Sequence, residues 1–237
     1  MRATLFGVPA SHPSLAAELM RHKGVDYRRV DLVNAAHRTV LRAMGFPGKT
    51  VPAMRLAGAK VQGTSAIARA LDALVPSPPL FPADPERRRA VEEAESWGDE
   101  VLQGVPRRLI WNALKHDRST LATYLEGSHT GIPTPIATRT AAPIVAASRR
   151  FNRATDEAAR RDLAALPRLI DRVDELIEEG VIGGSERNAA DFQIATSVSL
   201  LLTMEDARPL IEGRAAERLA RDVVPDQPGR MPSVFAT

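Results

Sequence analysis

The sequence of 237 residues contains no cysteine. Disulfide bonds, thiolate metal ligands and a cysteine nucleophile are therefore excluded for this chain. Thiol–disulfide exchange by the protein's own side chains is excluded for the same reason. We predict no metal site.

Aromatic residues and excess charge are also scarce, at 4% of the composition and a formal net charge of +3. Single-stranded nucleic acid is usually bound by stacking on aromatic side chains, which this sequence can hardly supply. Arginine clusters such as Arg87–Arg89, Arg107–Arg108 and Arg149–Arg150 alternate with acidic residues, a pattern typical of solvated helix faces. We therefore expect no nucleic-acid partner.

Long apolar runs are missing as well. No stretch approaches the roughly 18–20 apolar residues that a membrane-spanning helix needs. The first ten residues lead directly into an apolar strand instead of the core of a signal peptide. The expectation is a cytoplasmic protein with no membrane partner.

The patterns that are present divide the chain into two parts. Short apolar strands and amphipathic helices alternate over residues 1–75 in the order βαβαββα, which predicts a small α+β domain. Residues 75–85 contain five prolines, so residues 76–85 are predicted to be a linker. Residues 86–237 show helical spacing of apolar residues, with an extended tail from Val224, which predicts an all-α domain.

Residues 50–72 form the most informative stretch. Val51-Pro52 precedes a predicted strand, and a proline there removes one donor from the sheet. If the Val51-Pro52 bond is cis, the backbone of Val51 faces outward and is free to pair with a peptide-like ligand. Thr64 and Ser65 then open a helix, where a hydroxyl either caps the helix or binds a carboxylate at its positive end.

A second polar signal precedes the most apolar helix of the sequence. Asn188 and Asp191 stand three residues apart before the run FQIATSVSLLL, as in a capping box with aspartate in place of the usual glutamate. The run carries too few charges for a surface helix, so we expect a buried central helix that begins at Asn188.

Four short motifs, in the same order along the chain as in the family, resemble those of the cytosolic glutathione transferases, and the resemblance covers nearly the whole chain. In chain order, they are similar to the family's K-G-I-x-Y, G-K-V-P-A, E-S-x-A-I-A and S-x-A-D-hydrophobic segments. In this sequence they lie at Lys23–Tyr27, Gly48–Ala53, Gln62–Ala68 and Asn188–Phe192.

The resemblance implies a thioredoxin-like glutathione-binding domain, an all-helical second domain and a homodimer. By the same resemblance, the Val51 backbone would pair with the cysteinyl part of glutathione, held in place by cis-Pro52. Ser65 would bind the γ-glutamyl carboxylate, and Lys49 would approach the glycyl end. Thr64 would replace the acidic residue that contacts the γ-glutamyl ammonium group, so one charged contact would be missing.

The catalytic hydroxyl of the family is expected at the start of the first helix, where it stabilises the glutathione thiolate. Counting back from Lys23-Gly24 places Ala10 at this position. Ser11 is the nearest candidate, with Ser14 second and His12 third. Ser11 or Ser14 could instead cap the helix, and His12 could be a surface residue.

The resemblance thus implies an enzyme that conjugates or reduces small electrophiles with glutathione as cosubstrate, as in detoxification. The acceptor pocket would lie in the helical domain, and the sequence suggests four large side chains for it. These are Trp97, Leu102, Ile110 and Trp111. Two alternatives remain open, a non-catalytic binding or regulatory protein on the same fold and a transferase that uses another small thiol.

Overall fold

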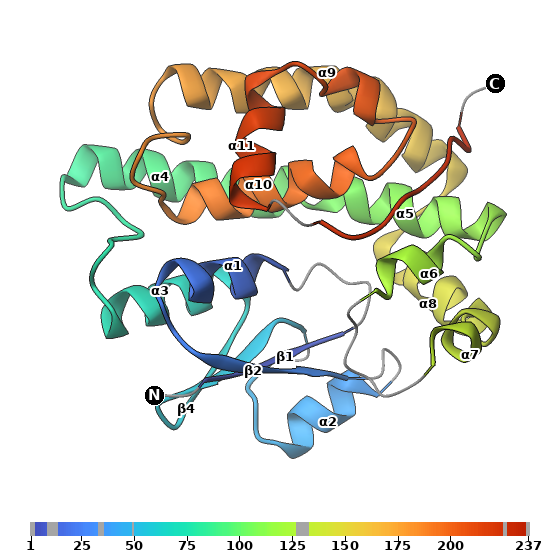
Figure 1. Ribbon diagram of the computed structural model, residues 1–237, viewed down its shortest axis with the longest axis horizontal. Helices are drawn as coiled ribbons and strands as arrows, with labels where there is room; N and C mark the ends of the chain where they lie inside the picture. Colours follow the sequence, from blue (N-terminus) through green and yellow to red (C-terminus); the bar gives the residue numbers. More distant parts are fainter. Residues whose placement is uncertain are drawn as a thin grey trace.

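The computed structural model describes residues 3–8, 14–32, 36–48, 50–126, 133–224 and 227–235. A four-stranded sheet with helices on both faces comes first along the chain, and the remaining helices gather above it (Figure 1). The predicted fold class, a thioredoxin-like domain followed by an all-α region, is confirmed.

The sheet has the strand order β2-β1-β3-β4. β1 pairs with β2 in parallel and with β3 antiparallel, and β3 and β4 form a hairpin. The hairpin turns through Ala57 and Gly58, which both have positive φ (48° and 84°), as a tight two-residue turn requires. The strand bounds are β1 (Ala3–Gly7), β2 (Tyr27–Asp31), β3 (Ala53–Leu56) and β4 (Ala59–Gln62).

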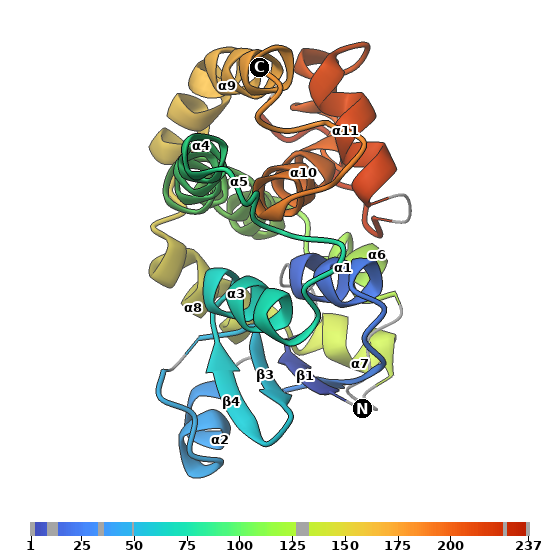
Figure 2. The same cartoon turned by 90° about the vertical axis from the view of Figure 1, so that its left-hand side faces the viewer.

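The two faces of this sheet are covered unequally. Successive residues of a strand point to opposite faces, and in β1 both Leu5 and Phe6 are buried. Leu5 packs with residues of α1 (Ser14–His22) and α3 (Thr64–Leu74), which lie side by side on one face. Phe6 packs with Leu41 of α2 (His37–Ala43), which lies on the opposite face (Figure 2).

The helical region is built around α10, in which every residue is buried. Asn188 accepts from the Asp191 N–H, and the Asp191 carboxylate accepts from the Asn188 N–H, so the predicted capping box is confirmed. The elements of this region are α4 (Pro85–Trp97), the π-helix η1 (Gly98–Leu102), α5 (Gly104–His116), α6 (Leu121–Tyr124), α7 (Thr134–Arg139), α8 (Ala142–Asn152), α9 (Asp156–Glu178), α10 (Ala189–Leu202), the 3₁₀ helix η2 (Arg208–Leu210) and α11 (Ala215–Val223).

Two details differ from the sequence-based expectations. The tail is not merely extended, since Met231 forms an isolated bridge with Met204. Arg108 does not belong to a solvated face, because its guanidinium forms two hydrogen bonds, of 2.6 and 2.9 Å, with the buried Asp162 carboxylate.

No helix among the described residues combines the length and the apolar character that crossing a bilayer would require. The Val51-Pro52 peptide bond is cis, as predicted, and Ser77-Pro78 is a second cis bond in the proline-rich linker.

Candidate functional site

The start of α3 is a helix end without a side-chain cap. Gly63 occupies the N-cap position with φ 90° and ψ 148°, and among the described residues no side-chain cap hydrogen bond forms at this helix end. The first intrahelical bond runs from Ile67 N to Gly63 O (3.0 Å). The hypothesis that Thr64 or Ser65 caps this helix is therefore wrong. Because the first turn contains no acidic residue, its N–H groups and dipole suit an added carboxylate.

The segment that holds Val51 lies beside this helix end. The Gly63 N–H donates to the Pro52 carbonyl (2.9 Å), which joins the entry of β3 to the start of α3. Sheet pairing of β3 with β1 begins at Ala53, so the half-buried Val51 lies just outside the ladder. The uncapped helix end and the backbone of Val51 are thus side by side.

Gln62 holds this arrangement together and was not predicted from the sequence. Its Oε1 accepts from the Gly48 N–H, and its Nε2 donates to the Thr50 carbonyl. A Cβ atom added to Gly48 would lie 2.7 Å from Oε1 of Gln62, so a larger residue there would displace the end of the Gln62 side chain. In the sequence, the position of Gln62 immediately before Gly63 placed it near the site, but nothing indicated that its side chain would bond to the backbone of Gly48 and Thr50.

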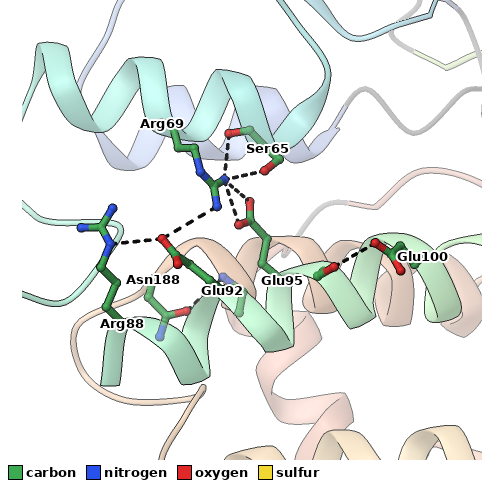
Figure 3. Close-up of polar contacts among 9 residues, drawn as sticks. Ser65, Arg69, Arg88, Glu92, Glu95, Glu100 and Asn188 are labelled. Carbon is green, nitrogen blue, oxygen red and sulfur yellow. Dashed lines mark hydrogen bonds and ion pairs between the residues drawn. The ribbon is translucent and has the colours of Figure 1, made fainter. Parts of the chain in front are cut away.

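A charged network joins α3 to α4 at the same place (Figure 3). The Arg69 guanidinium donates to the Ser65 hydroxyl and carbonyl, and to both carboxylate oxygens of Glu95 (3.0 and 3.3 Å). Glu95 is only 5% exposed, and burial raises the pKa of its carboxyl, while Arg69 and then Ser65 oppose that shift. The Ser65 hydroxyl is therefore already engaged by Arg69 in this structure.

The motif can be compared with this geometry residue by residue. When the family segment E-S-x-A-I-A is aligned on Ala66-Ile67-Ala68, Thr64 falls on its serine and Gly63 on its acidic residue, so the placement given above, with Ser65 as the serine and Thr64 in place of the acid, is shifted by one residue. Thr64 is also the first residue of α3, whereas Ser65 lies one residue further into the helix. Two neighbouring hydroxyls, not one, are thus candidates for a carboxylate contact.

Some predicted site residues cannot be placed in this way. Ser11, His12 and Lys49 lie outside the described residues, and so does the side chain of Ser14, the first residue of α1. Val51, Pro52, Thr64 and Ser65 are described, and the bond from Gly63 to Pro52 brings their two segments together.

The residues suggested for an acceptor pocket differ among themselves. Leu102 (0% exposed) and Ile110 (6% exposed) belong to the hydrophobic core, while Trp97 and Trp111 are partly exposed against it. In this conformation Leu102 therefore has no surface to offer a substrate. A cavity of about 410 Å³ lies elsewhere, between the linker at Pro79, the start of α4 and the loop before α10 at Glu186.

Comparison with known proteins bears on the fold. Residues 5–79 match the family model described as the glutathione S-transferase N-terminal domain. No curated protein matches the sequence. Glutathione transferase F2 from Populus trichocarpa is similar to this chain with a TM-score of 0.65 at 14% identity, over 94% of this chain and 93% of that one.

Two bacterial structures are similar in the same way. A glutathione S-transferase from Rhodospirillum rubrum F11 has a TM-score of 0.60 at 17% identity, over 94% of this chain and 92% of that one. A glutathione S-transferase from Methylobacterium radiotolerans, in complex with glutathione sulfonate, has a TM-score of 0.54 at 20% identity, over 100% of this chain and 98% of that one. At these identities the similarity is one of fold.

Proposed function

The chain is a glutathione S-transferase-like protein by its fold and its N-terminal domain, and on that premise we propose that it binds glutathione and transfers it to small electrophiles. Glutathione is the nucleophile in this reaction, because the chain has no cysteine of its own. The protein supplies binding, orientation and a lower pKa for the bound thiol.

The observation that carries the proposal is the hydrogen bond from Gly63 N to Pro52 O. It places an uncapped helix end, which favours a carboxylate, next to the backbone of Val51, which lies just outside the ladder. Glutathione carries both complementary groups, a γ-glutamyl carboxylate and a cysteinyl backbone. In this proposal Thr64 or Ser65 binds the carboxylate, Val51 pairs with the cysteinyl unit, Pro52 holds that segment, and Lys49 approaches the glycyl end.

A second candidate function is a non-catalytic binding module of the same fold, or a transferase for a different small thiol. The position of Gly63 supports it, because a glycine where the family has an acidic residue leaves the γ-glutamyl ammonium group without that carboxylate. The engagement of Ser65 by Arg69 supports it as well.

Titration calorimetry with glutathione tests the binding proposal. We expect Thr64→Ala to weaken glutathione binding about 10- to 100-fold, as for the loss of a hydrogen bond to a charged group worth roughly 1.5–3 kcal/mol. Ser65→Ala is the matched variant one residue along the helix. If Ser65 binds the carboxylate instead, the larger loss moves to that variant. No binding of glutathione to the wild-type protein would contradict the proposal.

Turnover of glutathione with 1-chloro-2,4-dinitrobenzene tests the catalytic part. If the Ser11 hydroxyl stabilises the thiolate, Ser11→Ala lowers kcat about 10- to 100-fold and leaves the dissociation constant of glutathione nearly unchanged. Ser14→Ala and His12→Ala are the comparison variants for the other two candidates. Full activity in all three, or none in the wild type despite binding, would favour the non-catalytic module.

A further inference from the structure

A row of cations crosses the sheet on the side that carries α2. The registers pair Thr4 with Arg28 of β2 and with Arg55 of β3, and they pair Arg55 with Lys60 of β4. Residues paired across strands point to the same face, so these four side chains share one face of the sheet. At about 4.8 Å between strands, the row is about 14 Å long.

This row is exposed because α2 covers only the neighbouring part of the face. Phe6, two residues after Thr4 and on the same face, is buried with Leu41 of α2. Arg28, Arg55 and Lys60 are all exposed. Figure 2 shows α2 near one end of the sheet, with α1 and α3 on the other side. The Lys60 ammonium lies beside Gly45 at the end of α2, which connects the row to that helix.

Within the described part of the chain, no ion pair joins an acidic side chain to Arg28, Arg55 or Lys60, although the exposed Asp26 stands two residues before Arg28. Residues 1–75 contain eleven Lys and Arg but only four Asp and Glu. Three of those four acids are paired with other cations, since Glu18 binds Arg21, Asp31 binds Arg29 and Asp72 binds Lys23. Residues 76–237 have the opposite balance, with 21 basic and 25 acidic residues.

The row also carries an energetic cost. Arg55 and Lys60 are directly opposite each other, and like charges in that position destabilise a sheet. A like-charge pair that is kept in a sheet without a compensating contact is typical of a functional surface. We propose that this face, the Arg28–Thr4–Arg55–Lys60 row, is a docking surface for an acidic polypeptide segment rich in Asp and Glu.

The chemistry of the face favours a polypeptide over other polyanions. Arginine guanidinium groups bind carboxylates through two parallel hydrogen bonds, and the row contains two of them. The exposed large apolar side chains among the described residues are Val101, Ile136 and Phe151, and none of them belongs to a strand, so the row itself offers no apolar anchor for a bilayer. Three cations are also fewer than the six to ten phosphate contacts typical of a duplex-binding protein.

Fluorescence anisotropy with a labelled twelve-residue peptide of alternating Glu and Ser tests the proposal. At 50 mM salt we expect saturable binding that weakens as salt screens the charges. The double variant Arg28→Gln/Arg55→Gln should raise the dissociation constant at least tenfold. The matched control Arg160→Gln/Arg161→Gln removes the same charge from exposed positions of α9 and should change it less than twofold.

Several results would overturn the proposal. The first is an absence of saturable binding, and the second is an equal loss in both double variants, which would indicate a net-charge effect only. Tighter binding to phosphatidylserine vesicles or to a twelve-base-pair duplex, abolished by Arg28→Gln/Arg55→Gln, would assign the face to that partner instead. A change of oligomeric state in the same variant, measured by light scattering, would assign it to a second copy of this chain. Circular dichroism confirms that each variant is folded, and the proposal does not depend on glutathione binding.

Discussion

Asp191 is a fully buried carboxylate whose two oxygens are used by the backbone. Oδ1 accepts from the Gly183 N–H (2.6 Å) and Oδ2 from the Asn188 N–H (2.8 Å). Its place at the start of the buried helix α10 joins the preceding loop to the core. A buried donor without a partner costs about 1–3 kcal/mol, so the consequence of losing this side chain is large.

We expect Asp191→Ala to lower the free energy of unfolding by about 2–4 kcal/mol, because two buried N–H groups lose their acceptor. Urea unfolding measures this loss. The control is Asp84→Ala at the exposed N-cap of α4, where Asp84 accepts from the Arg87 N–H, and it should cost only about 1 kcal/mol. A near-zero effect at Asp191 would contradict the structural role. Glutathione affinity at permissive temperature should not change.

Glu95 leads to a prediction about pH. Burial raises the pKa of its carboxyl above the ordinary value of 4.5, so the folded protein retains a proton that the unfolded chain releases first. Stability from this group is present below the unfolded pKa and is lost as the pH rises through the folded pKa. Between pH 4 and pH 7, the wild type should therefore lose unfolding free energy relative to Glu95→Gln. Urea unfolding of both proteins at several pH values measures the difference in unfolding free energy. If the wild type instead gains stability relative to Glu95→Gln as the pH rises, the prediction is wrong.

At the scale of elements, the β3–β4 hairpin contains a repulsive pair. Arg55 and Lys60 are opposite each other on the exposed face. Arg28 lies in the same row but opposite the neutral Thr4. Both arginines are therefore exposed, but only Arg55 has a cation directly opposite it.

We expect Arg55→Thr to raise the free energy of unfolding by about 0.2–1 kcal/mol, because it removes the like-charge pair and adds a residue with good strand propensity. Arg28→Thr, the matched control, should give a smaller gain. Chemical denaturation of the two variants in parallel measures both. If Arg55→Thr destabilises the protein, the side chain has a stabilising contact and the argument from repulsion fails.

At the scale of the whole molecule, Lys23 joins the sheet domain to the linker. Its side chain is completely buried, and its ammonium group donates to Asp72 Oδ1 (2.7 Å), to the Val75 carbonyl (2.8 Å) and to the Pro78 carbonyl. Asp72 Oδ1 also accepts from the Leu80 N–H (2.7 Å). The end of α1, the end of α3 and the linker are thus held at one point.

Lys23→Met should lower the free energy of unfolding by about 3–5 kcal/mol, because it leaves Asp72 without its cation and two carbonyls without a donor. Arg89→Met in α4 provides the control. Arg89 pairs with Glu93 at 3.7 Å, the two side chains are 76% and 72% exposed, and removal of this surface pair should cost less than about 1 kcal/mol. Thermal and urea unfolding measure both variants. Equal effects would show that Lys23 contributes no more than a surface pair.

The sequence by itself determined the features that depend on near neighbours. The order of strands and helices follows from local periodicity, and the capping box follows from two residues three apart. The Val51-Pro52 segment and the start of α3 were also predicted, because each has a local chemical signal. The identity of the cap was wrong, since Gly63 takes that position without a side-chain bond.

The tertiary structure decided which distant residues meet. Arg69 and Glu95 are 26 positions apart, and their pairing engages the hydroxyl of Ser65 that the sequence left free. Arg108 and Asp162 are 54 positions apart, and their pairing turns an expected surface arginine into an interior contact. The cation row arises because β2, β1, β3 and β4 pair in that register. Periodicity specifies which face of its own element a residue occupies, but the partner of a charge depends on which elements pack together, and that is a property of the folded chain.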